Sequence, residues 1–208
     1  MTLKPRQWKN ISLFLTVSRL LVGPIFFLFY ISHGGIGLSI KVVPFILLIL
    51  ITLSEVSDFF DGYIARKFNV VTDLGKVLDP MCDSVTRSII FLTLTLPPVN
   101  LPIWLIFIFV FRDGVIGVLR TICALKGVAL AARQSGKIKA IIQAVSVYVI
   151  VVAMAWHAYG GISLFVLQLI AVYTMACGAI ITLLSALEYL KVNWKHVVSV
   201  SRVEPRHK

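Results

Sequence analysis

The sequence predicts an all-α integral membrane protein whose six helices cross the bilayer. Of the 208 residues, 59% are hydrophobic and 14% are charged. A single soluble core of this size cannot bury so much apolar surface, so we expect the chain to expose it to lipid. A spanning helix needs about 20 mostly apolar residues, and stretches of that length recur along the whole chain. Lys and Arg fall on alternate connections between these stretches, which supports the prediction of six spans.

Each predicted span is bounded by a polar or basic stretch. The first follows a basic amino-terminal segment; it is too long for a signal-peptide core and lacks a small-residue cleavage site, so we expect it to be retained. The second and third flank a polar segment around residues 66–76. The third and fourth are separated by residues 97–100, and the fifth and sixth by residues 157–161. The predicted spans are 11–33, 40–60, 77–97, 101–124, 138–158 and 162–190.

The positive charges predict the orientation of the chain in the membrane. Connections 32–39, 97–100 and 157–161 contain no Lys or Arg. The opposite ends carry Lys4, Arg6, Lys9, Arg66, Lys67, Lys76, Lys126, Arg133, Lys137, Lys139 and the tail from Lys191. Because Lys and Arg favour the cytoplasmic side, we expect a multi-pass protein of the inner, cytoplasmic membrane with both termini in the cytoplasm. One transmembrane domain is expected over 1–192, followed by a basic cytoplasmic tail over 193–208.

The net charge of +11 does not indicate a nucleic-acid-binding protein. No soluble domain remains on which a basic, aromatic-rich binding face could lie, and anionic lipid headgroups account better for the charge. Cys82, Cys123 and Cys177 lie in apolar or helical stretches without paired spacing. We therefore expect packing roles for them, rather than disulfides or metal binding.

Four aspartates stand out in this apolar chain. Asp58 and Asp61 are three residues apart, and Asp79 and Asp83 are four apart, so on helices each pair lies on one face. Two such pairs that face each other would form a cage of four carboxylates at the membrane edge, which requires a cation among them. Hard oxygen ligands favour Mg²⁺, Mn²⁺ or Ca²⁺. The sequence therefore predicts a divalent-metal site.

The segment after Asp61 indicates phosphate chemistry. We expect Asp58 and Asp61 to close the second helix and Asp79 and Asp83 to open the third, so that two helix ends meet across a short loop. Gly62 and Ala65 are small and allow a ligand close to the backbone, and the forked cation of Arg66 suits a phosphate oxygen. Carboxylates, metal and arginine together favour phosphoryl transfer at the cytoplasmic membrane surface.

The spacing Asp58-x-x-Asp61-Gly62-x-x-Ala65-Arg66, followed by Gly75, Asp79 and Asp83, resembles the signature of the CDP-alcohol phosphotransferase family. The resemblance implies six transmembrane helices, a homodimer and two divalent ions, Mg²⁺ or Mn²⁺. It also implies transfer of a substituted phosphate from a CDP-linked donor to an alcohol, with release of CMP.

The same resemblance assigns roles to the motif. It implies that the metal ligands are Asp58, Asp61, Asp79 and Asp83. It implies that the CDP-linked donor is held by Asp58, Asp61, Gly62, Ala65, Arg66 and Gly75. Asp83 would also be the catalytic base that takes the proton of the attacking hydroxyl.

Within the family, the chain is most similar to the phosphatidylglycerophosphate synthases, which use CDP-diacylglycerol and glycerol 3-phosphate. The similar segments are Asn10, Leu15-Thr16-x-x-Arg19, Pro24, Leu78-Asp79-Pro80, Arg112-Asp113, Leu119-Arg120 and Gly136-Lys137-x-Lys139-x-x-x-Gln143. An acceptor that carries its own phosphate needs a cationic pocket distinct from the metals. The candidates for it are Arg19, Arg112, Arg120, Arg133, Lys137 and Lys139. Ser84 and Ala140 stand where many of these synthases have Lys and Thr, and Arg87 is a candidate for the missing charge.

Two alternatives remain at this point. The same chemistry can serve another acceptor, such as serine, inositol, inositol phosphate or phosphatidylglycerol. A cation transporter would use the same acids differently, but its ionisable groups usually lie near the bilayer midplane, whereas these cluster at one edge. The preferred interpretation is an enzyme embedded in the lipid bilayer that takes CDP-diacylglycerol and glycerol 3-phosphate as partners. We expect it to bind no nucleic acid.

Overall fold

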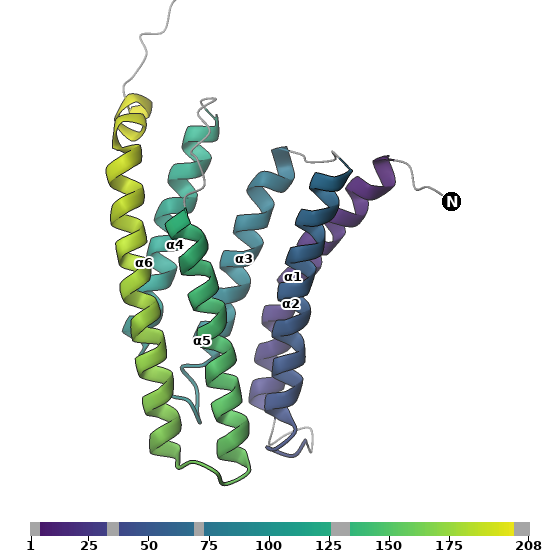
Figure 1. Ribbon diagram of the computed structural model, residues 1–208, viewed down its shortest axis with the longest axis vertical. Coiled ribbons are helices and arrows are strands. Elements are labelled where there is room, and N and C mark those ends of the chain that lie inside the picture. The colour runs from purple at the N-terminus through teal and green to yellow at the C-terminus, as the bar shows by residue number, and fades with distance from the viewer. Residues whose placement is uncertain (1–4, 33–37, 69–72, 126–133, 202–208) are drawn as a thin grey trace, which may run out of the picture.

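The computed structural model describes residues 5–32, 38–68, 73–125 and 134–201 (Figure 1). Within these ranges every long stretch of regular secondary structure is an α-helix, and no strand occurs. The helices are α1 (Pro5–Ile31), α2 (Val43–Lys67), α3 (Asp73–Thr93), α4 (Ile103–Leu125), α5 (Gln134–Ala158) and α6 (Leu164–Ser201). In lipid every backbone N–H and C=O must be paired internally, and a helix achieves this within one segment. The predicted all-α architecture is confirmed for the described residues, which form six helices.

The helices form a bundle with two halves (Figure 1). In one half α1 packs against both α2 and α3; in the other, α6 packs against both α4 and α5. Contacts between α2 and α5 and between α3 and α4 join the halves. This arrangement brings the first helix beside the two helices that carry the aspartate pairs.

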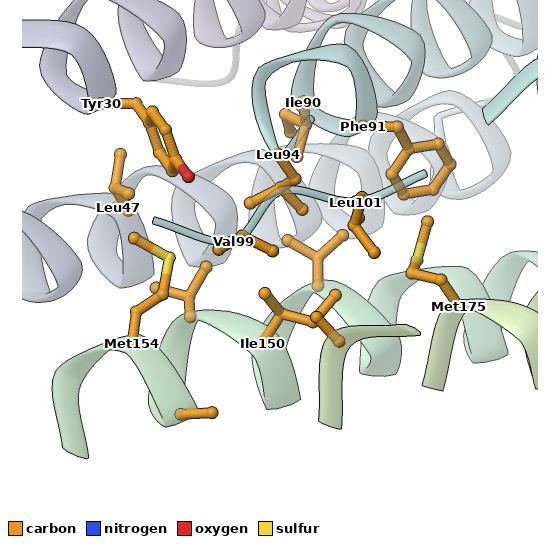
Figure 2. Packing of buried hydrophobic residues seen from close by; sticks show 14 of the residues in the cluster. Tyr30, Leu47, Ile90, Phe91, Leu94, Val99, Leu101, Ile150, Met154 and Met175 are labelled. Carbon is orange, nitrogen blue, oxygen red and sulfur yellow. The ribbon is translucent and has the colours of Figure 1, made fainter. Parts of the chain in front are cut away.

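The apolar core fills the end of the bundle that contains the connection from α3 to α4. Figure 2 shows Tyr30, Leu47, Val99 and Ile150 among the side chains that meet there, and all four are almost fully buried. They come from α1, α2, the α3–α4 connection and α5. The core therefore holds these helices together at one end. The aspartates lie nearer the ends of α2 and α3 that the α2–α3 connection joins.

Four helices are long and apolar enough to cross a membrane, which is typical of a multi-pass membrane protein. They contain the spans Leu13–Ile31, Val43–Ile64, Ser135–Ala158 and Leu164–Trp194. Within the described ranges, α3 and α4 are the two helices outside this set, because charged residues such as Asp83 and Arg112 interrupt their apolar runs. The described ranges therefore contain six helices, and the crossing of the membrane by all six stays a prediction.

The structure differs from the predicted positions of some helix ends. We expected the second span to end near residue 60 and the third to begin at 77, but α2 continues to Lys67 and α3 begins at Asp73. All four aspartates thus lie within helices instead of closing α2 or opening α3, because helical hydrogen bonding continues past the apolar stretch. Helix α6 likewise runs to Ser201, so the predicted tail is helical up to that residue; residues 202–208 lie outside the described part.

Candidate active site

A buried arginine of α1 lies among the aspartates of α2 and α3. Arg19 is 1% exposed. Its Nη1 donates to Oδ1 of Asp83 at 2.8 Å and to Oδ1 of Asp58, and its Nη2 donates to Oδ2 of Asp61 at 2.7 Å. One guanidinium therefore joins three carboxylates from two helices.

Thr16, one turn before Arg19 on α1, brings in the fourth carboxylate. Its hydroxyl lies 2.9 Å from Oδ1 of Asp79 and 3.1 Å from Oδ2 of Asp61, within hydrogen-bond distance of both. Thr86 of α3 donates to the backbone carbonyl of Arg19 at 3.0 Å and so ties α3 to α1. We call Arg19, Asp58, Asp61, Asp79 and Asp83 the acidic cluster.

The spacing of the residues explains why they meet. Asp58 and Asp61 are three residues apart on α2, Asp79 and Asp83 four apart on α3, and Thr16 and Arg19 three apart on α1. Each spacing places both members on one helix face. Because α1 packs against both other helices, its polar face meets the two acidic faces.

Among the described residues, the acidic cluster has more carboxylates than neighbouring cations. Arg19 pairs with three of the four aspartates, Arg87 lies 3.8 Å from Asp83, and the Nε of Arg19 has no hydrogen-bond partner there. Asp58 and Asp83 are also accessible, with side chains 46% and 34% exposed. A cation from solution can therefore reach Asp58 and Asp83.

The donor set suits a hard divalent cation. Carboxylate oxygens are the ligands that Mg²⁺ and Mn²⁺ prefer. In the described ranges, no three acidic, His or Cys side chains already form a ready-made metal-binding group. Arg19 explains this, because its guanidinium lies where the carboxylate oxygens converge. The residues fit a metal if Arg19 shifts its contacts.

Four of the residues predicted to hold the CDP-linked donor lie nearer the α2–α3 connection than the acidic cluster does. Gly62 follows Asp61 on α2 and is partly buried, and Gly75 lies one turn before Asp79 on α3. Ala65 and Arg66 belong to α2, but their side chains lie outside what the structure describes. The helix positions place all four on the same side of the carboxylates.

A second charged group, the basic cluster of Arg112, Asp113 and Lys139, joins α4, α5 and α6. Nη1 of Arg112 donates to Oδ1 of Asp113 at 3.0 Å, and its Nη2 donates to the hydroxyl of Ser185 at 3.1 Å. Nζ of Lys139 donates to the same Asp113 oxygen. All three charged side chains are at most 13% exposed.

Only part of the predicted acceptor set meets in the basic cluster. Arg112 and Lys139 come together, whereas Lys137 is exposed on α5 and Arg120 lies two turns further along α4. Arg133 lies outside the described residues. Arg19 is grouped with the aspartates instead, because α1 packs against α2 and α3.

Comparison with known proteins identifies the family. The model of the CDP-alcohol phosphatidyltransferase family matches residues 9–184, most of the chain. The chain belongs to the CDP-alcohol phosphatidyltransferase family. Members of this family transfer phosphatidyl groups and generally use divalent metal ions.

Several curated relatives are similar over most of their length. A CDP-diacylglycerol–glycerol-3-phosphate 3-phosphatidyltransferase of Rickettsia felis is 25% identical over 90% of this chain and 97% of its own. The protein of the same name from Bacillus subtilis is 32% identical over 64% of this chain and 72% of its own. A probable phosphatidylglycerophosphate synthase of Mycobacterium tuberculosis is 26% identical over 87% and 80%. This phosphatidyltransferase is therefore a membrane transferase of phospholipid biosynthesis.

The sequence analysis gave no role to three residues that complete the site of this phosphatidyltransferase. Thr16 links Asp61 with Asp79, Thr86 anchors Arg19, and Asp113 holds Arg112 and Lys139. For Thr16 a signal was available, since it is a polar residue one turn before Arg19 in an apolar stretch. The partners of Thr86 and Asp113 lie on other helices, and no local pattern reveals them.

Proposed function

We propose that this chain transfers the phosphatidyl group of CDP-diacylglycerol to glycerol 3-phosphate, giving phosphatidylglycerol phosphate and CMP. The observation that carries the proposal is the convergence of Asp58, Asp61, Asp79 and Asp83 on two side chains of α1, within a family that transfers phosphatidyl groups. The match with the relatives covers most of their length, and their names support this choice of donor and acceptor.

The four aspartates would hold two divalent ions, Mg²⁺ or Mn²⁺. When bound, these ions would neutralise the diphosphate of the donor and the charge that develops on the leaving CMP. The surplus of carboxylates over cations in the acidic cluster supports this role. Arg19 would then give up part of its contacts with Asp58 and Asp83 and remain nearby as a positive charge.

The donor would lie with its CDP part toward the α2–α3 connection. Gly62, Ala65 and Gly75 have little or no side chain and would let the nucleotide approach the helices closely. Arg66 would pair with a phosphate oxygen through its forked N–H groups. This arrangement would place the phosphorus that is attacked beside the carboxylates.

Asp83 would take the proton of the attacking hydroxyl. The acceptor oxygen forms a bond to the phosphatidyl phosphorus, the bond from that phosphorus to CMP breaks, and the proton passes to a carboxylate oxygen of Asp83. The side chain of Asp83 is one-third exposed, so an acceptor can approach it. Its Oδ1 is bound to Arg19, which orients the carboxylate.

Positive charge for the acceptor phosphate would come from the predicted set. Arg112 and Lys139 carry one more positive charge than Asp113 neutralises, so the basic cluster favours an anion nearby. Lys137 and Arg120 flank it on α5 and α4, and Arg19 borders the reacting centre.

All six helices would cross the cytoplasmic membrane, with both termini and the acidic cluster on the cytoplasmic side. The distribution of Lys and Arg supports this orientation. The homodimer implied by the family resemblance stays a prediction, which crosslinking in native membranes would test.

The decisive experiment follows CMP release by the purified chain from CDP-diacylglycerol with a panel of acceptors. We expect turnover with glycerol 3-phosphate and little with serine, inositol, inositol phosphate or phosphatidylglycerol. Preference for another acceptor would keep the chemistry and replace the substrate. Cation flux in liposomes without any CMP release would contradict the enzyme and favour a transporter.

A further inference from the structure

A pocket lies between α2, α3 and α5, directly beside the acidic cluster. Asp58 and Asp83 line one edge of it, and Ile51, Ile90 and Val147 line its other end. Ile51 lies seven residues before Asp58, and Ile90 seven after Asp83. At 1.5 Å per helical residue, the pocket extends about 10 Å along the helices from the carboxylates. A second substrate that meets the phosphatidyl group has to lie next to these carboxylates, and this pocket does.

Arg87 is the one positively charged side chain among the described residues that line this pocket. Its Nη1 donates to the backbone carbonyl of Ala140 on α5 at 3.2 Å, which holds it against the pocket wall. Its Nη2 lies 3.7 Å from Oε1 of Glu55 and 3.8 Å from Oδ2 of Asp83. These distances are too long for direct hydrogen bonds. Because a guanidinium has five N–H donors, Arg87 can still donate to an incoming anion.

Gln143 of α5 provides a second, independent sign of a ligand. The residue is 1% exposed and lines the same pocket, and its Nε2 donates to the hydroxyl of Thr182 at 3.4 Å. Its Oε1 is buried without a hydrogen-bond partner among the described residues. Buried polar atoms are nearly always paired, so a polar group from outside the chain is expected here.

The cations of the basic cluster are held by shorter contacts to their acidic partner than Arg87 is. Arg112 donates to Asp113 and Ser185, with its Nε unpartnered among the described residues, and Lys139 donates to Asp113. Lys139 lies one turn before Gln143 on α5, so this cluster borders the pocket and adds a positive field to it, although neither cation is among the residues that line it.

We infer that this pocket receives the acceptor, a small alcohol that carries a phosphate group. Arg87 contacts the phosphate, Gln143 bonds a hydroxyl that does not react, and the reacting hydroxyl faces Asp83. The inference rests on the proposed function and names contacts that the acceptor set of Arg112, Arg120, Lys137 and Lys139 does not include.

In this arrangement Glu55 weakens the binding of the acceptor, whereas Arg87 strengthens it. Oε1 of Glu55 lies 3.7 Å from Nη2 of Arg87, so Glu55 competes with the acceptor phosphate for the guanidinium. Removing its charge with Glu55→Gln should therefore strengthen acceptor binding, whereas removing Arg87 should weaken it. Opposite effects from two neighbouring residues are not expected if both only support the fold.

The experiment measures binding and turnover in the purified full-length chain with Mn²⁺. Calorimetry gives the Kd of glycerol 3-phosphate and of uncharged glycerol, and CMP release gives KM for both substrates. For Arg87→Gln we expect Kd and KM for glycerol 3-phosphate to rise about tenfold to hundredfold, with Arg87→Lys in between. For Gln143→Leu the expected rise is about twofold to tenfold. Binding of glycerol and the KM for CDP-diacylglycerol should not change in the Arg87 variants.

Lys191→Gln is the matched control, because it removes one positive charge from an exposed site on α6. Wild-type turnover with unchanged KM in both the Arg87→Gln and Gln143→Leu variants would overturn the inference and leave the proposed reaction intact. Binding that depends on Arg87 in a chain that releases no CMP would support the pocket and reject the reaction. A wild-type chain that neither binds glycerol 3-phosphate nor releases CMP would overturn both.

Discussion

The acidic cluster and the basic cluster are both buried groups of charges that join three helices, yet they differ in balance and access. In the acidic cluster Arg19 pairs with three of the four aspartates, and two of the carboxylates are one-third to one-half exposed. In the basic cluster two cations share Asp113, and every charged side chain is nearly buried. The first group can exchange its cation with the surroundings, whereas the second is closed.

This difference separates two uses of charge within one bundle. A buried ion pair contributes little net stability, but removing one partner from it is strongly destabilising. The basic cluster therefore fixes α4, α5 and α6 relative to one another. The surplus of carboxylates in the acidic cluster is useful only if a cation or a substrate completes it. Five experiments test this division, from the largest expected effect to the smallest.

Removal of divalent ions should affect only the acidic cluster. With exhaustive chelation we expect CMP release to fall by at least about a thousandfold, because the metals provide several kcal/mol of charge stabilisation. Mg²⁺ or Mn²⁺ should restore it. Undiminished turnover in chelator would contradict the metal site.

Asp83→Asn should abolish most turnover and leave donor binding largely intact. The amide fills the same space but cannot take the proton, and loss of such a group typically costs about 10²-fold to 10⁴-fold in rate. Single-turnover rates and CDP-diacylglycerol binding, measured side by side, check this. Equal loss of binding and rate would make Asp83 chiefly a metal ligand.

Asp113→Asn should destabilise the fold because it leaves Arg112 and Lys139 as buried, unpaired cations. We expect a loss of about 3–5 kcal/mol in the free energy of unfolding, measured by denaturation in detergent. An unchanged unfolding midpoint would show that the basic cluster does not hold its three helices together.

Arg19→Gln should make stability depend on metal. Without its internal cation the acidic cluster repels itself, so in chelator we expect a loss of about 2 kcal/mol, less than for a fully buried pair because Asp58 and Asp83 are accessible. Mn²⁺ should remove most of this loss and bind more tightly than to the wild type. Weaker Mn²⁺ binding, followed by electron paramagnetic resonance, would show that Arg19 assists the metal instead of competing with it.

Lys137→Ala gives the smallest expected effect and sharpens the contrast with its neighbour. Lys137 is exposed and Lys139 is buried against Asp113. We expect a change within about 0.5 kcal/mol in the stability of the Lys137 variant and a clear loss for Lys139→Ala. Equal losses would mean that burial does not distinguish these two lysines.

The sequence alone determined the helices and the membrane class, because both depend on local properties. Runs of about 20 apolar residues need no partner to be recognised. Spacings of three and four residues likewise predicted that Asp58 and Asp61, and Asp79 and Asp83, share a helix face. The predicted helix ends differed from the observed ones, since α2 and α3 continue beyond their apolar stretches as long as backbone hydrogen bonds can form.

Only the tertiary structure decided which charges meet. Arg19, Arg112 and Lys139 look alike in sequence as cations in apolar helices, and all three were therefore candidates for one acceptor pocket. Packing of α1 against α2 and α3 places Arg19 among the aspartates, while Arg112 and Lys139 share Asp113 on the other side of the bundle. A partner on another helix is set by how helix faces pack, and the spacing of residues along one helix carries no information about that choice.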